Sequence, residues 1–597
     1  MRAAADIIHS ATTPSLPAPI ARWFTSRGWQ PHAHQLATLA ATAAGESVLL
    51  IAPTGGGKTL AGFLPALVEV SAAAALQGRA RIGVRRTSAL HTLYISPLKA
   101  LAVDIARNLQ TPIAEMGLPI TVETRTGDTP PARRTRQRMA PPDILLTTPE
   151  QLALMLSYRD SERLFGGLRL IVIDELHALV GSKRGDLLAL GLARLGRVAP
   201  AARRIGLSAT VAAPDDLRRY LLPSGAARLV QGRAGAPPDI AILSSTARIP
   251  WSGHTGRHAY AELYAAIQQA RTALVFVNTR SQAEMVFQSL WRLNEANLPI
   301  ALHHGSLAVE QRRKVEAAMT RGALRAVVCT STLDLGVDWG AVDLVVQLGA
   351  PKGVSRLLQR IGRANHRLDE ASRALLVPSN RFEVLECRAA IETIAEGLLD
   401  GEGPRVGGLD VLAQHILGRA CAGPFAADAL YEEVRATLPY RELTRDSFEQ
   451  VLDYVATGGY ALRQYERYRR LRKSPADGLW RVAHPKVANQ YRLNVGTIVA
   501  DPMLKVKYRR GRVLGEVEES FIEALVPGDT FVFGGEVLRF EGIRDLFAEV
   551  TPSDATEPKV PAYAGGKFPL STFLAERVRA IMARPQDHPD LPEQVVE

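Results

Sequence analysis

Ala52-Pro53-Thr54-Gly55-Gly56-Gly57-Lys58-Thr59 is the segment from which the fold of this chain can be deduced. An apolar run at 47–51 precedes it and predicts a buried strand, and the run 60–67 after it predicts the start of a helix. A glycine-rich loop between a strand and a helix can turn its backbone N–H groups toward an anion, and the helix N-terminus adds the positive end of its dipole. The pattern therefore predicts a phosphate-binding loop and disfavours a glycine turn without a ligand. Ala52 departs from the general pattern, which has glycine at that position.

The chemistry expected of this loop is nucleotide binding with a metal ion. Lys58 would reach the β- and γ-phosphates of ATP, and the Thr59 hydroxyl would ligate Mg²⁺. A later apolar run at 170–173 ends in Asp174, which can hold the metal through water, and Glu175, which can orient or deprotonate the attacking water. ATP and Mg²⁺ are thus the predicted cofactors. The loop residues expected to contact the nucleotide are Thr54, Gly55, Gly56, Gly57, Lys58 and Thr59, and the metal-side residues are Thr59, Asp174 and Glu175.

Two further segments follow at wide spacing. Ser208-Ala209-Thr210 comes after a strand-like run, and Gln359-Arg360-Ile361-Gly362-Arg363 can supply arginines to the γ-phosphate. With the phosphate loop and Asp174-Glu175-Leu176-His177, in this order, they resemble the superfamily 2 helicases of the DExH subgroup. The resemblance implies catalytic roles for Lys58, Asp174, Glu175, Arg360 and Arg363.

The same resemblance implies more contacts to ATP. Gln35 would read the adenine edge, although a surface glutamine behind a helix-start proline remains an alternative. The segment 335–340 resembles the motif whose aspartate contacts the ribose. The family often has a further arginine after Arg363, but His366 stands in that place here and Arg367 is one residue late, so Arg363 is the favoured arginine finger. The remaining residues assigned to the nucleotide are His177, Gly336, Asp338 and Gln359.

Short polar loops beside the predicted strands resemble the loops with which these helicases grip a nucleic-acid strand. Hydroxyls and backbone N–H groups contact phosphates without reading sequence. Any one of these loops could be an ordinary turn, and their ordered set favours the functional interpretation. The residues are Pro97, Lys99, Thr126, Gly127, Thr147, Thr148, Asn278, Arg280, Thr330 and Ser331.

The alternation of short apolar runs with longer helical patterns predicts an α/β fold. We expect two tandem RecA-like parallel-sheet domains followed by a winged helix and a strand-rich domain. The predicted divisions are a loose N-terminus at 1–20, a first RecA-like domain at 21–225, a linker at 226–255, a second RecA-like domain at 256–400, a winged helix at 404–485 and a strand-rich domain at 486–597.

The winged helix is predicted from three successive helical patterns, at 409–421, 426–438 and 445–456, with Thr444 as an N-cap of the third. A basic segment with interspersed tyrosines follows at 463–473. It is either a solvated hairpin or a surface that contacts nucleic-acid backbone and stacks bases. The arginines assigned to nucleic acid in this segment are Arg467, Arg469 and Arg470.

Composition supports an enzyme with a polyanionic partner. The chain has 597 residues, of which 47% are hydrophobic, and a formal net charge of +12. A basic balance favours nucleic acid as a partner. Three dispersed cysteines indicate neither a zinc knuckle nor a disulfide framework. No apolar run reaches the roughly 18 residues that span a bilayer, and no secretion signal is evident, so no membrane partner and a cytoplasmic location are expected.

The order of domains is similar to that of the large helicase-related (Lhr) family, and in particular to its bacterial DNA-repair branch, sometimes encoded beside a DNA ligase. This implies ATP hydrolysis dependent on single-stranded DNA, driving 3′-to-5′ translocation and unwinding of tailed DNA or RNA:DNA duplexes, with repair proteins such as a ligase or nuclease as partners. Many members continue past Glu597, which implies a core or short version here. The alternatives are an RNA helicase or remodeller, a nucleotide-gated clamp without turnover, and the motor subunit of a nuclease machine.

Overall fold

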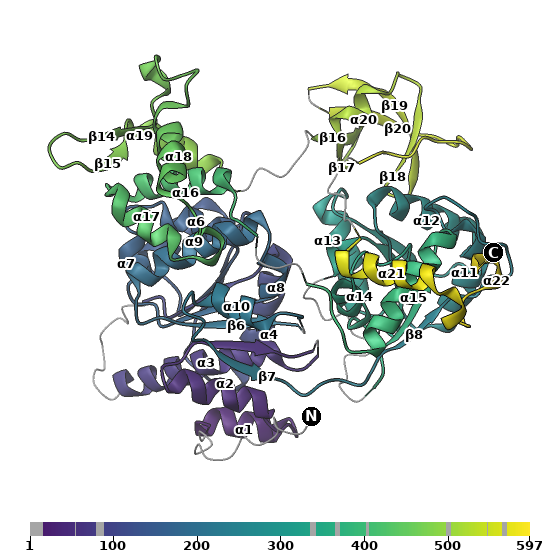
Figure 1. Ribbon diagram of the computed structural model, residues 1–597, viewed down its shortest axis with the longest axis horizontal. Coiled ribbons are helices and arrows are strands. Elements are labelled where there is room, and N and C mark those ends of the chain that lie inside the picture. The colour runs from purple at the N-terminus through teal and green to yellow at the C-terminus, as the bar shows by residue number, and fades with distance from the viewer. Residues whose placement is uncertain are drawn as a thin grey trace. The chain divides into compact units, whose positions relative to one another are not determined.

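Two units make up the chain, and each combines segments distant in sequence. In the computed structural model, unit 1 consists of Met1–Arg233 with Glu402–Thr497, and unit 2 of Ala234–Gly401 with Ile498–Glu597 (Figure 1). The structure describes residues 16–53, 55–78, 89–209, 211–334, 342–364, 370–401, 405–496, 503–545, 547–563 and 570–596. The chain therefore passes between the units three times.

Unit 1 contains a seven-stranded parallel sheet with the order β3-β4-β2-β5-β6-β1-β7. Its strands are β1 (Val48–Ile51), β2 (Thr92–Ile95), β3 (Val122–Arg125), β4 (Ile144–Thr147), β5 (Leu170–Ile173), β6 (Arg203–Ser208) and β7 (Arg228–Gln231). Its helices are α1 (Ala18–Ser26), α2 (Ala33–Ala43), α3 (Lys58–Gly78), α4 (Lys99–Glu115), α5 (Pro131–Met139), α6 (Pro149–Leu156), α7 (Ser161–Phe165), α8 (Leu176–Leu179), α9 (Lys183–Val198) and α10 (Pro214–Leu221). The helix α1 begins inside the segment 1–20 that was expected to be loose.

Both faces of this sheet are covered, as the continuous apolar runs predict for parallel strands. In β1, Val48 and Leu50 pack with α1 to α4, whereas Leu49 and Ile51 pack with α6, α9 and α10 on the other face. All four side chains of β1 are buried. The sheet therefore presents the loops at its carboxyl edge as the accessible site.

The winged helix also belongs to unit 1. It consists of α16 (Leu409–Ala422), α17 (Ala427–Arg435), α18 (Arg445–Thr457), an antiparallel hairpin of β14 (Leu471–Lys473) and β15 (Trp480–Val482), and α19 (Pro485–Leu493). The three predicted helices are confirmed, and Thr444 caps α18 by accepting the Ser447 N–H at 3.2 Å. Pro439, which cannot donate to a helical hydrogen bond, lies in a short 3₁₀ turn after α17 instead of continuing it.

The predicted end of the winged helix at residue 485 is wrong. Val487 and Tyr491 of α19 are buried in the same apolar core as α16 and α18, so the domain continues to the end of α19. Leu187 and Leu190 of α9 are part of that core as well. The winged helix and the first parallel-sheet domain thus share buried apolar side chains.

Unit 2 contains a six-stranded parallel sheet with the order β10-β11-β9-β12-β13-β8. Its strands are β8 (Asp239–Ile242), β9 (Ala273–Phe276), β10 (Ile300–His303), β11 (Ala326–Cys329), β12 (Leu344–Leu348) and β13 (Arg373–Val377). Its helices are α11 (Tyr260–Gln269), α12 (Arg280–Leu293), α13 (Val309–Thr320), α14 (Val354–Ile361) and α15 (Arg381–Ala395). This is the second RecA-like sheet that the sequence predicts.

The prediction that residues 226–255 form a linker is wrong in part, because this segment contains two strands, β7 and β8. β7 pairs with β1 in the first sheet, and β8 pairs with β13 in the second. Only residues 232–238 lie between these strands. Both are edge strands with partly exposed side chains, so they lack the continuous apolar run that identifies a central strand.

A five-stranded sheet with the order β17-β16-β20-β19-β18 forms the strand-rich domain of unit 2. Its elements are β16 (Met503–Tyr508), β17 (Val513–Glu518), α20 (Glu519–Glu523), β18 (Thr530–Phe533), β19 (Glu536–Arg544) and β20 (Phe547–Pro552). Val506, Phe531 and Val550 are among the residues of its own buried core.

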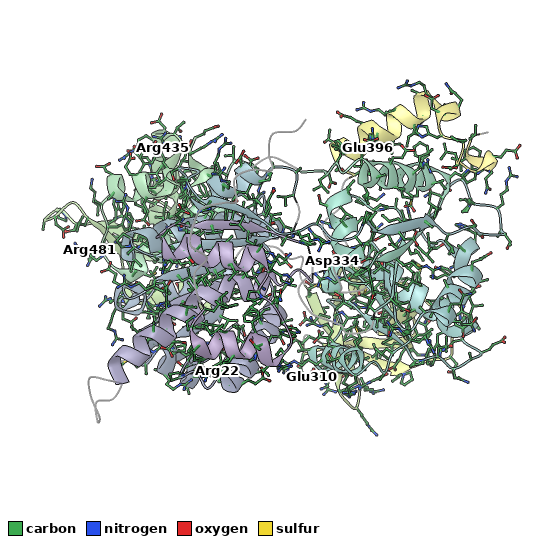
Figure 2. All side chains as sticks on the ribbon, turned by 90° about the horizontal axis from the view of Figure 1, so that it is seen from below. Arg22, Glu310, Asp334, Glu396, Arg435 and Arg481 are labelled. Carbon is green, nitrogen blue, oxygen red and sulfur yellow. The ribbon has the colours of Figure 1, made fainter. Side chains whose placement is uncertain are left out.

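The chain from 570 onward does not belong to this sheet, contrary to the predicted division. Two helices, α21 (Thr572–Ala583) and α22 (Glu593–Val596), end the chain, and Figure 1 shows α21 beside α15. Leu574 and Val578 share a core with Val384 of α15, and Arg577 forms an ion pair with Glu396. Glu396 is labelled in Figure 2. None of the helices within the described ranges has the length and apolar character needed to cross a membrane.

Candidate functional site: nucleotide and track loops

The phosphate-binding loop lies between β1 and α3, and Lys58 is the first residue of that helix. Gly55 and Gly57 have φ of 77° and 72°, which is left-handed backbone that glycine adopts without strain. A Cβ on Gly57 would also lie 2.7 Å from Gln35 Nε2, closer than a carbon can approach. Lys58 and Thr59 therefore stand at a helix N-terminus, as anion binding requires, while Thr54 is outside the described residues.

Gln35 holds this loop from α2. Its Oε1 accepts the His32 N–H at 2.9 Å, and its Nε2 donates to the Gly57 carbonyl at 3.2 Å. The side chain is buried. The structure brings Gln35 to the phosphate loop, and its contact with adenine stays a prediction.

Asp174 and Glu175 follow β5 at the same edge of the sheet. Asp174 Oδ2 accepts the Tyr94 hydroxyl at 2.5 Å, and Oδ1 accepts the Glu175 N–H at 2.8 Å. Burial and the charge of Glu175 raise the pKa of Asp174 to about 6, and the nearby positive charge of Lys58 opposes this rise. Asp174 is thus fixed in position close to Lys58.

Glu175 has a left-handed backbone, with φ 47° and ψ 44°. A residue with a Cβ holds this conformation at a cost of about 1–3 kcal/mol, and such residues cluster at functional sites. Its Oε2 lies 3.6 Å from His177 Nε2. In this turn the carboxylate of Glu175 lies beside the imidazole of His177.

His177 connects two of the predicted motifs. Its Nδ1 lies 3.0 Å from the Ser208 hydroxyl and accepts the Ala209 N–H at 3.4 Å. An accepting Nδ1 places the proton on Nε2, which faces Glu175. The ring therefore joins the carboxylate after β5 to the loop after β6, and Thr210 lies outside the described residues.

Arg360 and Arg363 of unit 2 are both held at Asp334. Arg360 Nε and Nη2 donate to the Asp334 carboxylate at 2.9 and 3.3 Å, and its Nη1 donates to Gln347 at 2.5 Å. Arg363 Nη2 donates to the Asp334 carbonyl at 2.9 Å. Both arginines are buried, and Figure 2 labels Asp334. Arg360 is thus engaged within its own domain on all three nitrogens, and the role of Arg363 as the arginine finger stays a prediction.

The other predicted residues of this region are placed only in part. Gln359 is half-buried on α14. Gly336, Asp338, His366 and Arg367 lie outside the described residues, so the choice of the last arginine finger is not tested.

The order of strands divides the carboxyl edge of the first sheet into two halves. The phosphate loop follows β1, Asp174 follows β5 and Ser208 ends β6, and these strands are neighbours in the order β5-β6-β1. The predicted grip residues follow three of the four remaining strands, which are neighbours in the order β3-β4-β2. They are Pro97 and Lys99 after β2, Thr126 and Gly127 after β3, and Thr147 and Thr148 at the end of β4.

Contacts within the second half show that these loops meet. Lys99 Nζ pairs with Asp128 at 3.2 Å and lies 2.9 Å from the position of a Cβ on Gly127. The Thr147 hydroxyl donates to the Arg125 carbonyl at 2.8 Å. The predicted nucleotide residues and the predicted grip residues therefore occupy adjacent parts of one sheet edge.

In unit 2 the predicted grip residues follow β9 and β11, which are also neighbours. Asn278 Nδ2 donates to the Ala350 carbonyl at 3.0 Å, and Arg280 Nη1 donates to the Ser306 hydroxyl at 3.1 Å. Thr330 is buried and Ser331 is exposed.

The basic segment of the winged helix is an exposed loop between α18 and β14. Arg467, Arg469 and Arg470 are exposed, and Arg467 Cζ lies 4.7 Å from the ring centroid of Tyr468 and 5.8 Å from that of Tyr465. The structure thus presents arginines together with aromatic faces, as the sequence predicts.

Sequence reasoning missed two residues that hold predicted site residues in place, Tyr94 in unit 1 and Asp334 in unit 2. Tyr94 looks like a core residue of an aliphatic strand, but a fully buried hydroxyl requires a partner, which is Asp174. Asp334 stands directly before the predicted ribose-binding segment, and only the fold reveals that both arginines converge on it.

Two parallel sheets that carry these loops in this order define a helicase of superfamily 2. Family models agree: a DEAD/DEAH box helicase domain matches residues 32–217, a helicase conserved C-terminal domain matches 258–367, and the winged helix domain of the large helicase-related protein matches 392–560. The chain belongs to the large helicase-related (Lhr) family.

Individual relatives support this assignment. The chain is 36% identical to the ATP-dependent helicase Lhr-Core of Methanothermobacter thermautotrophicus, over 90% of this chain and 64% of that protein. It is 34% identical to the Lhr helicase/uracil glycosylase of Escherichia coli, over 93% of this chain and 40% of that protein. The structure of Mycobacterium smegmatis helicase Lhr bound to single-stranded DNA and AMP-PNP matches with a TM-score of 0.72 and 33% identity, covering 88% of this chain and 68% of that one. The chain thus spans less than two thirds of the length of these two curated relatives.

Proposed function

We propose that this protein is an ATP-dependent DNA helicase whose ATPase is stimulated by single-stranded DNA. The observation that carries the proposal is the division of one sheet edge into a nucleotide half and a grip half. The name and bound ligands of the M. smegmatis relative, single-stranded DNA and AMP-PNP, support this choice of track and nucleotide. Movement in the 3′-to-5′ direction, unwinding of DNA or RNA:DNA duplexes and a role in DNA repair are part of the proposal.

The metal expected with ATP is Mg²⁺. Thr59 and Asp174 offer hydroxyl and carboxylate oxygens, the ligand type that Mg²⁺ prefers, and this ion takes its other ligands from phosphates and water. The residues fit the ion, which would neutralise charge on the phosphates when bound.

The residues of the chain divide the work of hydrolysis. Lys58 holds the phosphates, Glu175 accepts a proton from or orients the attacking water, and His177 passes changes at Glu175 to the loop at Ser208. Arg363 adds positive charge to the γ-phosphate when ATP is bound, in the role of an arginine finger. ATP hydrolysis is coupled to the nucleic-acid strand because the grip loops lie on the same sheet edge as the nucleotide loops.

The test is the ATPase rate with and without single-stranded DNA, and with RNA of the same sequence. We expect DNA to stimulate the parent protein and Glu175→Gln to bind ATP without turnover, because the amide keeps the shape but cannot take the proton. Lys58→Ala is the control that loses phosphate binding. Stimulation by RNA alone would favour the RNA helicase, and ATP binding without any turnover in the parent would favour a nucleotide-gated clamp. Duplexes with 3′ or 5′ tails then test the direction.

A further inference from the structure

The residues that begin α12 are attached to the strand-rich domain of the same unit. Arg280 Cζ lies 5.0 Å from the ring centroid of Tyr563. The neighbouring Ser281 hydroxyl donates to the Pro561 carbonyl at 2.6 Å. The segment that follows β20 therefore contacts the first turn of α12, which carries the predicted grip residue Arg280.

Ser306, the other partner of Arg280, is held by strand β17. Glu516 N–H donates to the Ser306 carbonyl at 2.9 Å, and Ala308 N–H donates to the Leu514 carbonyl at 2.9 Å. A Cβ on Gly515 would lie 2.0 Å from the Ser306 carbonyl oxygen, so only glycine permits this approach. Both partners of the Arg280 guanidinium are thus fixed by the strand-rich domain.

A buried carboxylate completes the attachment. Glu284 of α12 is fully buried and accepts the N–H groups of Gly534 and Gly535, in the β18–β19 turn, at 2.6 and 2.9 Å. His304 Nδ1 accepts the Ser306 N–H at 3.3 Å, so the proton of this imidazole is on Nε2, which donates to Glu284 at 3.0 Å. The network leaves little freedom for the strand-rich domain to move relative to α12.

We propose that Tyr563 is a positioning residue that holds Arg280 for contact with a phosphate of the nucleic-acid strand, so that the strand-rich domain forms part of the grip. This rests on the proposed function, in which Arg280 contacts the strand. A guanidinium has five N–H donors, and the Ser306 hydroxyl takes one of them. An aromatic face beside a guanidinium attracts it and restricts its rotamers, which lowers the entropy lost when a phosphate binds.

The experiment uses the full chain and measures the concentration of oligothymidylate that gives half-maximal ATPase stimulation. Tyr563→Ala is expected to raise that concentration about 2- to 5-fold, the range of a cation–π contact, with the stimulated maximum kept within about two-fold. Tyr563→Phe retains the ring and is expected to match the parent. Tyr563→Leu fills the space without a π face and is expected to resemble Tyr563→Ala. Tyr508→Ala, in the same domain, is the matched control.

The same measurement in an Arg280→Ala background decides the mechanism. If Tyr563 acts through Arg280, Tyr563→Ala has no further effect there. If Tyr563→Ala raises the half-maximal concentration as much in that background as in the parent, the positioning role is wrong. It is also wrong if Tyr563→Leu has the half-maximal concentration of the parent. If Arg280→Ala itself leaves the half-maximal concentration at the parental value, the track role of Arg280 is wrong, which is a failure of the proposed function rather than of Tyr563 alone.

Discussion

The winged helix and the strand-rich domain are each attached to a parallel-sheet domain, but by different chemistry. The winged helix shares an apolar core with α9, to which Leu187 and Leu190 contribute. The strand-rich domain is attached by hydrogen bonds, centred on Glu284 and the backbone of Gly534 and Gly535. The winged-helix attachment adds polar contacts to this apolar core, such as the Gly408 N–H that donates to the buried Asp186 carboxylate of α9 at 3.0 Å. Apolar contacts are not directional, whereas the hydrogen bonds to Glu284 are directional and fix the orientation of the strand-rich domain.

This difference matters for the proposed movement along a nucleic-acid strand. A loop that grips phosphates must keep its geometry through each cycle, and Arg280 lies at the directional attachment. The basic loop of the winged helix is exposed and far in sequence from its attachment. We therefore expect the strand-rich domain to act on the grip and the winged helix to act as a surface that retains the strand.

The largest expected effect is on the rate of ATP hydrolysis, and it comes from a residue that belongs to neither attachment. Arg363→Ala is expected to spare ATP binding and to reduce turnover about a thousandfold, the effect of removing an arginine finger. The measurement is single-turnover hydrolysis beside nucleotide binding. Arg360→Ala is the comparison, because it also releases Asp334 and Gln347 and should destabilise unit 2. A fully active Arg363→Ala would contradict the assigned role.

The apolar attachment is broken by Leu190→Ala. A buried leucine changed to alanine costs about 2–5 kcal/mol, and Leu190 is fully buried against the winged helix. Hydrogen exchange of the α16 amides should speed up accordingly. Leu192→Ala is the matched control, since Leu192 is equally buried on the same helix but packs into the sheet core. Equal acceleration in α16 by both variants would show that the attachment does not depend on Leu190.

The directional attachment is broken by Glu284→Ala. Two glycine N–H groups and the His304 N–H lose their acceptor, at about 1–3 kcal/mol for each donor left unmet. Hydrogen exchange in the β18–β19 hairpin should accelerate, and less so in Glu284→Gln, which keeps one acceptor oxygen. If the β18–β19 hairpin of Glu284→Ala exchanges hydrogen at the parental rate, the carboxylate is not the main attachment of the strand-rich domain.

Acid is expected to weaken the winged-helix attachment through His415 of α16. Burial lowers the pKa of His415 to about 4, and the charges of Arg194 on α9 and Arg419 on α16 add to the effect. The unfolded chain binds this proton near pH 6.5 and the folded chain does not, so the free energy of unfolding falls by about 1–3 kcal/mol as pH drops from about 6.5 to 4.

The variant His415→Gln isolates this contribution. Burial raises the pKa of Asp186 and of Glu433 near the same attachment, and those groups change stability in the opposite direction. The difference between the stability profiles of parent and variant is therefore the relevant measurement. A variant that loses as much stability in acid as the parent would show that His415 is not the group that titrates.

The smallest effect concerns the exposed loop. Changing Arg467, Arg469, Arg470 and Arg472 together to alanine should lower DNA affinity and flatten its salt dependence by about 0.7 units of slope for each lost phosphate contact. Exchange of the α16 amides should stay parental, because the loop takes no part in the attachment. Unchanged affinity and slope would identify the loop as a charged surface only.

The sequence predicted what depends on local pattern. The central strands β1 and β5 are continuous apolar runs, and the phosphate loop and the Asp174–Glu175 pair follow them directly. The edge strands β7 and β8 were missed because their side chains are partly exposed. Helix α21 was assigned to the wrong domain because its amphipathic pattern does not say which surface it covers.

Long-range polar partners were beyond sequence reasoning. Glu284 looks like a solvent-facing residue of a polar helix, and its burial depends on glycines some 250 positions later in the chain. The same holds for Tyr94, whose partner Asp174 follows another strand, β5. The nucleotide site was therefore predicted by motif, while its supporting residues required the fold.

Because the chain passes between the units three times, the boundaries of stable protein fragments are not contiguous in sequence. A fragment that stops before Glu402 encodes the first parallel sheet but leaves Leu187 and Leu190 of α9 without their apolar cover, which favours aggregation. A fragment that keeps this cover is instead a fusion in which a flexible linker joins Met1–Arg233 to Glu402–Thr497. Recombination that exchanges whole modules would have to respect the same interleaved boundaries, so the two motor halves are expected to have evolved together with their attached domains.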